Sequence, residues 1–491
     1  MRRALLLVCL TAPLACGAEP TAKLEQIISQ SPAVSRAFVG VQVVRLSDDK
    51  VLYARNADRL FVPASNMKLF TAALALRRLG PDYRFKTQVL GEGTLDTSGT
   101  LTGDLRLVGG GDPSLSGRDY PYQHHPGSTA AYSFRAIEEL ADQVVAHGVR
   151  RIDGDVVGDD SRYVWEPYAS GWSSGNALWE YGAPVSALIL NDNSFAIAVR
   201  PGGQVGDLAE VRLTPALEYF AVDNRVATTE GGERKIQIDR SAAGRELHVW
   251  GVIPRRDPGV TELLAVADPA LYTAQALRDA LERRGVAIHG AETAQHRHAD
   301  DKSADGVSNS AGVLAERTSP PLLELLKVAD KVSQNLHMEV FLREAAVAAG
   351  RPGSRENGLS EMASFLDALG ISKESYQFTD GSGLSRSTLV SPAAIVKLLA
   401  AMYKSPDRER WMDLLPVGGQ DGTLGSRFNG HAEARAIRAK TGTLDHVKAL
   451  SGFVESGSDG AVAFSFLVNN FEEPAPEVNR LLDALALALA R

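Results

Sequence analysis

Ser65 and Lys68 stand three positions apart and could together carry out acyl transfer. On a helix, this spacing places both side chains on one face, one turn apart. A serine hydroxyl is a weak nucleophile that needs a base, and a lysine in a partly dry site beside other cations can lose its proton and act as that base. The backbone N–H of Ser65, at a helix start, could also bind an oxyanion. Taken alone, the motif is better explained as a chance match on a surface helix.

A second motif, Ser333-Gln-Asn335, could move protons and hold the first motif in place. Its two reactive residues lie two apart, which does not suit one face of a regular helix, so we expect a short loop between helices. There, Ser333 could relay a proton toward a leaving amine, while Asn335 could hold Lys68 and a substrate amide. By itself, the motif is better explained as a turn or a helix cap.

A third motif, Lys440-Thr-Gly-Thr443, ends an expected strand. Lys440, with the hydroxyl of Thr441 or Thr443, could bind a terminal carboxylate, and the Thr443 N–H could pair with that of Ser65 as a second oxyanion donor. Gly442 has no side chain, so a substrate could lie against the strand. An edge-strand hairpin with a solvated lysine is the alternative. The three motifs in this order favour acyl transfer through a covalent acyl-enzyme, with no metal and no cofactor.

The overall composition limits the class of protein. The chain has 491 residues, of which 44% are hydrophobic and 23% charged, and this predicts a folded protein of two or three domains. Its formal net charge of −8 leaves no basic surplus to neutralise phosphates, so we expect no nucleic-acid partner.

Residues 1–18 have the pattern of a secretory signal peptide, with two arginines followed by a short apolar run and small residues. We therefore expect an exported protein, periplasmic or associated with the cell envelope. The only two cysteines, Cys9 and Cys16, lie in this segment, so cleavage after Ala18 would leave none for a disulfide. Cleavage before Cys16, with a lipid anchor on its thiol, is the alternative.

Local patterns predict the elements that must position the motifs. Residues 38–53 alternate polar and apolar around a turn, which predicts a hairpin, and Pro63 and Gly80 bracket a helix that begins near Ser65. From about 85 to 307, short β-like runs alternate with glycine-rich turns. The other expected elements are helices at 134–147, 271–284, 320–349 and 391–403, then three strands and a helix at 434–443, 447–455, 461–469 and 477–490.

With these features, the sequence resembles the D-alanyl-D-alanine carboxypeptidase/endopeptidases of the penicillin-binding protein 4 type. They are low-molecular-mass members of the serine penicillin-recognising enzymes. The resemblance covers nearly the whole chain after the signal region. One departure is Gln334, which stands where members often have Asp. Besides the three motifs, the segments that carry the resemblance are Leu107-Val-Gly-Gly-Gly-Asp-Pro113, Tyr181-Gly-Ala-Pro184, Asp380-Gly-Ser-Gly-Leu-Ser-Arg386 and Asp421-Gly-Thr-Leu424.

The resemblance implies an α+β fold. It consists of a transpeptidase domain like that of the serine β-lactamases and DD-peptidases, with an antiparallel sheet flanked by helices and nested β-rich insertions. On this basis we expect the penicillin-binding domain at 24–90 and 308–491. An inserted domain II is expected at 91–165 and 265–307, and a nested β-rich domain III at 166–264.

The resemblance also implies the activity. Members hydrolyse the terminal D-Ala-D-Ala bond of peptidoglycan stem peptides, often cleave cross-links, and are acylated by penicillins on the motif serine, here Ser65. An acidic residue of the insertion and an arginine line the family's pocket for the stem side chain, and the matching positions are Asp159 and Arg386. They could pair with the amine and carboxylate of diaminopimelate. A plain turn in Gly158-Asp-Asp-Ser161 explains Asp159 about as well, and Asp160 could take its place.

Two other functions remain open from the sequence. A β-lactamase or esterase could use the same fold, although the chain shows no obvious separate acidic base for fast deacylation. A non-catalytic peptidoglycan-binding module would belong to another class. The full set of reactive residues, Ser65, Lys68 and Lys440, argues against it.

Overall fold

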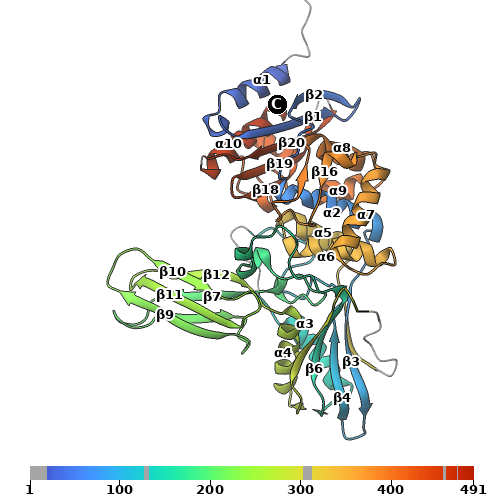
Figure 1. Ribbon diagram of the computed structural model, residues 1–491, viewed down its shortest axis with the longest axis vertical. Coiled ribbons are helices and arrows are strands. Elements are labelled where there is room, and N and C mark those ends of the chain that lie inside the picture. Colours follow the sequence, from blue (N-terminus) through green and yellow to red (C-terminus); the bar gives the residue numbers. More distant parts are fainter. Residues whose placement is uncertain (1–18, 126–131, 302–311, 457–459, 473, 491) are drawn as a thin grey trace, which may run out of the picture.

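The computed structural model describes residues 19–125, 132–301, 312–456, 460–472 and 474–490. The expected signal peptide at 1–18, the alternative lipid anchor at Cys16 and much of the expected junction near 308 lie outside these ranges. Both ends of the described chain belong to one body, which stands above two β-rich bodies in Figure 1. In the described part, no helix combines the length and apolar character that a membrane span needs.

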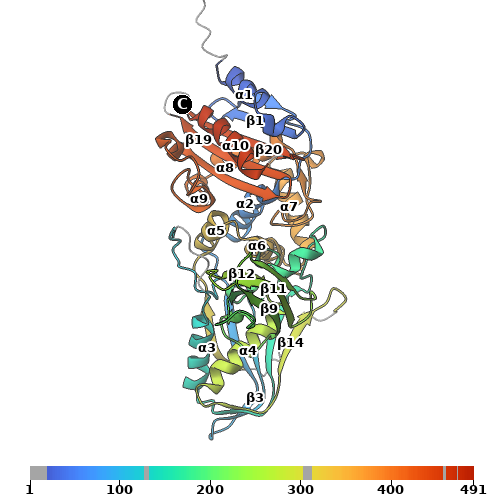
Figure 2. The same ribbon diagram turned by 90° about the vertical axis from the view of Figure 1, so that its left-hand side faces the viewer.

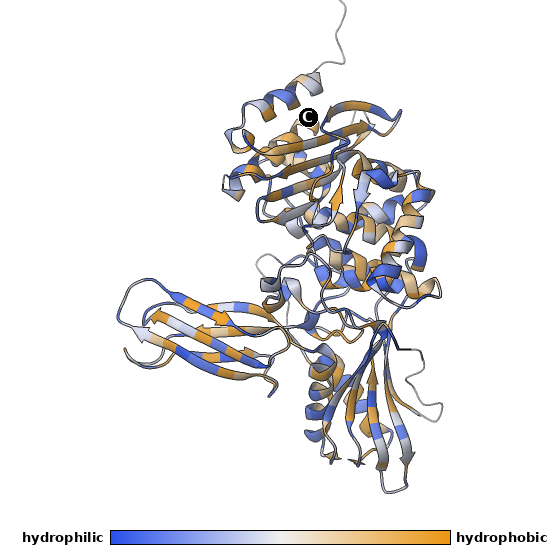
Figure 3. Ribbon diagram, viewed as in Figure 1, coloured by the Kyte–Doolittle hydropathy of each residue, from blue (hydrophilic) through white to orange (hydrophobic). Residues whose placement is uncertain are grey.

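A five-stranded antiparallel sheet forms the centre of the first body, in the strand order β18-β19-β20-β1-β2. The expected hairpin and the three expected C-terminal strands are thereby confirmed, and segments from opposite ends of the sequence meet where β1 pairs with β20. Apolar residues concentrate in this sheet (Figure 3). Its strands are β1 (Phe38–Arg45), β2 (Lys50–Arg55), β18 (Ile437–Leu444), β19 (Val447–Ser456) and β20 (Gly460–Asn469).

Helices cover both faces of this sheet, because its side chains alternate between two apolar cores. Val41 and Val43 share one core with α1 (Glu19–Ser29) and α10 (Ala475–Leu489). Phe453 and Leu467 share the other core with the remaining helices. Those helices are α2 (Met67–Leu79), α5 (Leu322–Lys331), α6 (Asn335–Ala348), α7 (Arg355–Ala368), α8 (Pro392–Tyr403) and α9 (Arg408–Leu414). The expected α+β architecture, with an antiparallel sheet between helical groups, is confirmed.

The first inserted body is a seven-stranded sheet with two helices, α3 (Arg135–Ala146) and α4 (Pro269–Glu282), both close to their expected positions. Because its strands run from residue 86 to residue 318, the sheet extends past the expected domain boundaries at 90/91 and 307/308, and the exact division stays a prediction. The strands are β3 (Lys86–Leu95), β4 (Thr100–Val108), β5 (Arg151–Ile152), β6 (Val156–Val164), β13 (Ala287–Ile288), β14 (Glu292–Arg297) and β15 (Gly312–Thr318).

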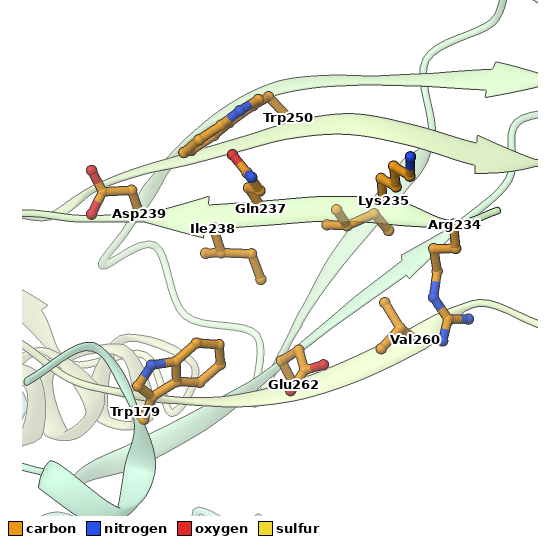
Figure 4. Close-up of a pocket in the computed structure, with 10 residues that line it drawn as sticks. Trp179, Arg234, Lys235, Gln237, Ile238, Asp239, Trp250, Val260 and Glu262 are labelled. Carbon is orange, nitrogen blue, oxygen red and sulfur yellow. The ribbon is translucent and has the colours of Figure 1, made fainter. Parts of the chain in front are cut away.

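The second inserted body is the arm that projects sideways in Figure 1. It consists of two three-stranded sheets, β10-β11-β9 and β12-β7-β8, so β10 and β12 are both edge strands. A pocket of about 570 Å³ lies between these two edges and is lined by Trp179, Ile238 and Glu262, among others (Figure 4). The strands are β7 (Ser194–Arg200), β8 (Glu210–Thr214), β9 (Ala221–Thr229), β10 (Lys235–Asp239), β11 (Glu246–Pro254) and β12 (Val260–Ala265).

The helices α5 and α6 lie between the five-stranded sheet and the inserted bodies in both views (Figures 1 and 2). They split the expected helical stretch 320–349 in two, with Val332, Ser333 and Gln334 between them. The second motif therefore lies at the middle of the molecule, where the chain turns from one helix into the next.

Candidate active site

Ser65 lies in a short 3₁₀ turn, Ala64–Asn66, that leads directly into α2. The side chain is only partly buried, so a substrate can reach it, whereas the helix that follows is buried on nearly every side. Asn66 donates from its amide to the carbonyl oxygen of Lys440 at 2.9 Å, which ties the first motif to the third. The expected helix start and its end at Gly80 are confirmed.

Lys68 is fully buried, and its Nζ has three close partners. It lies 2.8 Å from Ser65 Oγ, 2.6 Å from Asn335 Oδ1 and 2.8 Å from the carbonyl oxygen of Ser382. Burial, and then the nearby positive charge of Lys440, hold the pKa of Lys68 well below its usual range. A neutral amine has two hydrogens and one lone pair. Asn335 and Ser382 can accept the two hydrogens, which leaves the lone pair for the Ser65 proton.

The turn between α5 and α6 places Ser333 beside the third motif. Ser333 has φ +63°, a left-handed conformation that is costly for a residue other than glycine and is common at functional sites. Lys440 donates from Nζ to Ser333 Oγ at 2.8 Å. Gln334 caps α6 by accepting from the Leu336 N–H at 2.8 Å, so its side chain serves the helix start.

The third motif lies on β18, the edge strand of the sheet. The N–H of Ala439 donates to Pro416 on the side away from β19, and the two-residue repeat of a strand puts the Thr443 N–H on that same side. Thr441 Oγ1 donates to Thr423 Oγ1 at 2.8 Å, while the Thr443 hydroxyl accepts from Lys448 at 3.0 Å.

Gly442 is needed for a reason that the sequence does not give. A Cβ at this position would lie 2.6 Å from the carbonyl oxygen of Pro63, two residues before Ser65. Glycine therefore lets β18 approach the turn that carries the nucleophile. Whether it also leaves room for substrate stays a prediction.

The segment Asp380–Arg386 closes the site from another side, between the short strands β16 (Tyr376–Gln377) and β17 (Leu389–Val390). A Cβ at Gly383, where φ is +80°, would lie 1.9 Å from the carbonyl oxygen of Ala64, so this segment packs directly on the Ser65 turn. Arg386 is exposed and donates to the carbonyl oxygen of Asp445, just beyond the end of β18, at 2.7 Å. The structure thus places Arg386 beside the third motif.

Asp159 lies elsewhere, in the sheet of the first inserted body. Its side chain is 1% exposed, pairs with Arg106 at 3.2 Å, and accepts from the Ser161 N–H at 2.9 Å. Arg106 also pairs with Glu92. Among the described residues, no hydrogen bond or ion pair joins Asp159 to the groups around Ser65. Asp160 is also buried and accepts from Ser186. The geometry does not support a substrate role for Asp159.

Asp159→Asn should therefore act on stability. We expect the free energy of unfolding to fall by about 1–3 kcal/mol, the usual result of weakening a buried charged hydrogen bond. The ratio of kcat/KM between peptides with a free and an acetylated side-chain amine should stay unchanged. Denaturant unfolding and paired kinetics measure the two effects, with Arg106→Gln as the matched control. A selective loss on the free-amine peptide at unchanged stability would restore the substrate role.

Three contacts of the site were not expected from the sequence, although all three involve segments that carry the family resemblance. They are the Ser382 carbonyl oxygen on Lys68, the Thr423 hydroxyl on Thr441, and the Tyr181 carbonyl oxygen, which accepts from Asn335 Nδ2 at 2.8 Å. Two of the three groups are backbone carbonyls. Because every residue has one, no residue type marks them in advance.

The fold and this cluster define a class of protein. An antiparallel sheet between helices holds a partly exposed serine against a buried lysine, with a second serine and lysine beside them. This arrangement is that of the serine penicillin-recognising enzymes.

Comparisons with known proteins identify the family. The sequence model of the D-Ala-D-Ala carboxypeptidase 3 (S13) family matches residues 20–489. A D-alanyl-D-alanine carboxypeptidase of Actinomadura sp. (strain R39) is 34% identical over 493 aligned positions, which cover 97% of this chain and 86% of that protein. Penicillin-binding protein 4 of Haemophilus influenzae has the same fold, with a TM-score of 0.81 at 23% identity over 94% of this chain and 98% of that one. The chain belongs to the D-Ala-D-Ala carboxypeptidase 3 family.

Proposed function

We propose that this chain hydrolyses the terminal D-Ala-D-Ala bond of peptidoglycan stem peptides through an acyl-enzyme on Ser65, and that penicillins acylate the same serine. The observation that carries the proposal is the 2.8 Å contact between Ser65 Oγ and the buried Lys68, whose pKa is lowered by burial and by the charge of Lys440. Family membership supports the substrate, and a crystal structure of the Haemophilus influenzae protein in complex with a β-lactam supports the inhibitor class.

Acylation begins when the Ser65 proton passes to Lys68 as Oγ attacks the penultimate carbonyl carbon. The oxyanion forms against the backbone N–H groups of Ser65 and Thr443. The C–N bond then breaks, and the departing D-alanine amine takes a proton from Ser333. Ser333 is hydrogen-bonded to Lys440, which can replace that proton. When water attacks the ester, Lys68 returns its proton to the departing Ser65 Oγ. The proton that the water loses passes through Ser333 to Lys440, which restores the free enzyme.

The outer edge of β18 suits the peptide. Pro416 occupies this edge at Ala439, and the stretch from Thr441 to Thr443 follows, where an extended substrate can pair as an added strand. Lys440 and Thr441 then bind the terminal carboxylate, and Arg386 binds the carboxylate of the stem side chain. We further propose that the protein is exported and that it also cleaves cross-links between stem peptides.

Capping the substrate carboxylate as an amide should weaken the wild-type enzyme far more than Lys440→Ala. We expect kcat/KM of the wild type to fall by about 10-fold or more on capping, the scale of a hydrogen bond to a charged group, because the ammonium loses its partner. The variant has already lost that interaction and should respond little. Steady-state hydrolysis of both peptides by both enzymes measures the effect. Equal losses in the two enzymes would assign the carboxylate to other groups.

Two assays separate the remaining functions. A penicilloyl-enzyme that persists in intact-protein mass spectra is expected of a DD-peptidase, whereas rapid loss of the adduct would identify a β-lactamase. Purified protein should convert a monomeric muropeptide into a product that is lighter by one alanine. It should convert a cross-linked muropeptide into monomers. If neither muropeptide changes, a binding module becomes the better interpretation.

A further inference from the structure

Asp330 is a buried carboxylate that the mechanism above does not use. It lies on α5, three residues before Ser333, and is 0% exposed. Neither of its carboxylate oxygens has a hydrogen-bond partner within the described residues. Burying a carboxylate without such partners is costly, so a folded protein keeps one only where other charges compensate it.

The compensating charge is that of Lys440, the motif lysine that binds the carboxylate in the proposed function. Lys68 on α2 and Lys440 on β18 are both fully buried, and both interact electrostatically with Asp330. Their own hydrogen bonds go to uncharged oxygens: Lys68 contacts two side chains and one carbonyl, and Lys440 contacts Ser333 Oγ and a carbonyl. Lys331, the neighbour of Asp330, has its own partner in Asp421 at 2.7 Å.

Two other acids face Lys68, but hydrogen bonds already occupy both. Glu339 on α6 accepts from the N–H groups of Gly381 and Ser382 and pairs with Arg343. Asp380 accepts from several donors in its own segment and from Trp172. Asp330 is thus the acid at this site with no competing hydrogen bond among the described residues, and it is shared by both motif lysines.

We propose that Asp330 is a positioning residue whose negative charge keeps Lys440 an ammonium, so that Lys440 can bind the substrate carboxylate while Lys68 stays uncharged. The proposal rests on the function proposed above. Asp330 touches no substrate in this account, and its effect on carboxylate binding is exerted through Lys440.

The direction of the pH effect follows from the charges. Burial lowers the pKa of Lys440, and the charge of Asp330 raises it again. Burial raises the pKa of Asp330 to about 7, and the neighbouring lysines, Lys440 first, oppose that rise. Without the Asp330 charge, the pKa of Lys440 falls further, so the ammonium is lost at a lower pH. Carboxylate binding should then fail earlier as pH rises.

The test is Asp330→Asn, which removes the charge and keeps the shape. Two peptides that end in D-Ala-D-Ala are compared, one with a free carboxylate and one with a terminal amide. On the free acid, kcat/KM should fall by about 10-fold at alkaline pH, mainly through KM, which corresponds to about one pKa unit at Lys440. In a plot of kcat/KM against pH, the alkaline limb should move to lower pH by about one unit. On the amide the loss should be clearly smaller, because only the proton that Lys440 returns to Ser333 is then affected, and Asp330→Glu should restore the alkaline limb.

Equal losses on both peptides at every pH would overturn the proposal and make Asp330 a packing residue. If Asp330→Asn does not fold, the same change is made in Lys440→Gln, where no ammonium needs compensation. The double variant, with Lys440→Gln and Asp330→Asn, should bind penicillin no worse than Lys440→Gln alone. A further loss of penicillin binding in the double variant would contradict the proposed coupling between Asp330 and Lys440. A wild type that cleaves neither peptide would instead refute the proposed function, so the two failures are distinguishable.

Discussion

Ser65→Ala should fold normally and form no covalent adduct with penicillin. The reason is that Oγ is the atom that forms the ester, and in the described structure it lies 2.8 Å from Nζ of Lys68, whose pKa is lowered by burial. Incubation with penicillin followed by intact-protein mass spectrometry measures the adduct directly. Wild type should gain one penicilloyl group, and the variant should gain none.

Ser333→Ala is the matched control, because it removes the other hydroxyl of the site and leaves the nucleophile in place. This variant should still be acylated, at a reduced rate, since Ser333 only relays a proton in the mechanism. Labelling that survives in folded Ser65→Ala, or is abolished only in Ser333→Ala, would place the nucleophile elsewhere.

Lys68→Ala should slow acylation by about 10² or more, the usual contribution of a positioned base. Burial and the charge of Lys440 lower the pKa of Lys68, which favours the uncharged amine that can accept the Ser65 proton. As pH falls through that depressed pKa, the amine becomes charged and wild-type acylation should decline. Stopped-flow acylation by a chromogenic β-lactam over a pH series measures both effects.

Lys68→Arg separates the two roles that Lys68 could have. A guanidinium keeps a positive charge but cannot lose its proton in this range, so the variant should be about as slow as Lys68→Ala if Lys68 is the base. Near-normal acylation by Lys68→Arg would mean that a positive charge is all the site needs.

The sequence predicts much of the fold because its local patterns are strong. The hairpin at 38–53, the buried helix after Ser65 and the three C-terminal strands each have a clear period or a glycine or proline at their ends, and the structure confirms them. The three motifs meet because α2, the α5–α6 turn and β18 converge, with Lys68 on Asn335 and Lys440 on Ser333. Those contacts cannot be predicted from the spacing or the order of the motifs alone.

Contacts between residues that are distant along the chain could not be predicted from the sequence. The sequence suits Asp159 to a substrate pocket or to a turn, yet its side chain is buried and pairs with Arg106 on the neighbouring strand β4. Gly442 is explained by the nearness of Pro63, which lies more than 370 positions away in sequence. Asp330 resembles any acid on a helix until its neighbours Lys68 and Lys440 are placed beside it.

The most direct test of the central claim uses the natural type of substrate. A monomeric muropeptide that ends in D-Ala-D-Ala is incubated with the purified wild-type protein and with Ser65→Ala, and the products are weighed by mass spectrometry. The account predicts a product lighter by one alanine residue with the wild type, free D-alanine in equal amount, and no change with the variant. An unchanged muropeptide with folded wild type, or equal release of D-alanine by Ser65→Ala, would contradict it.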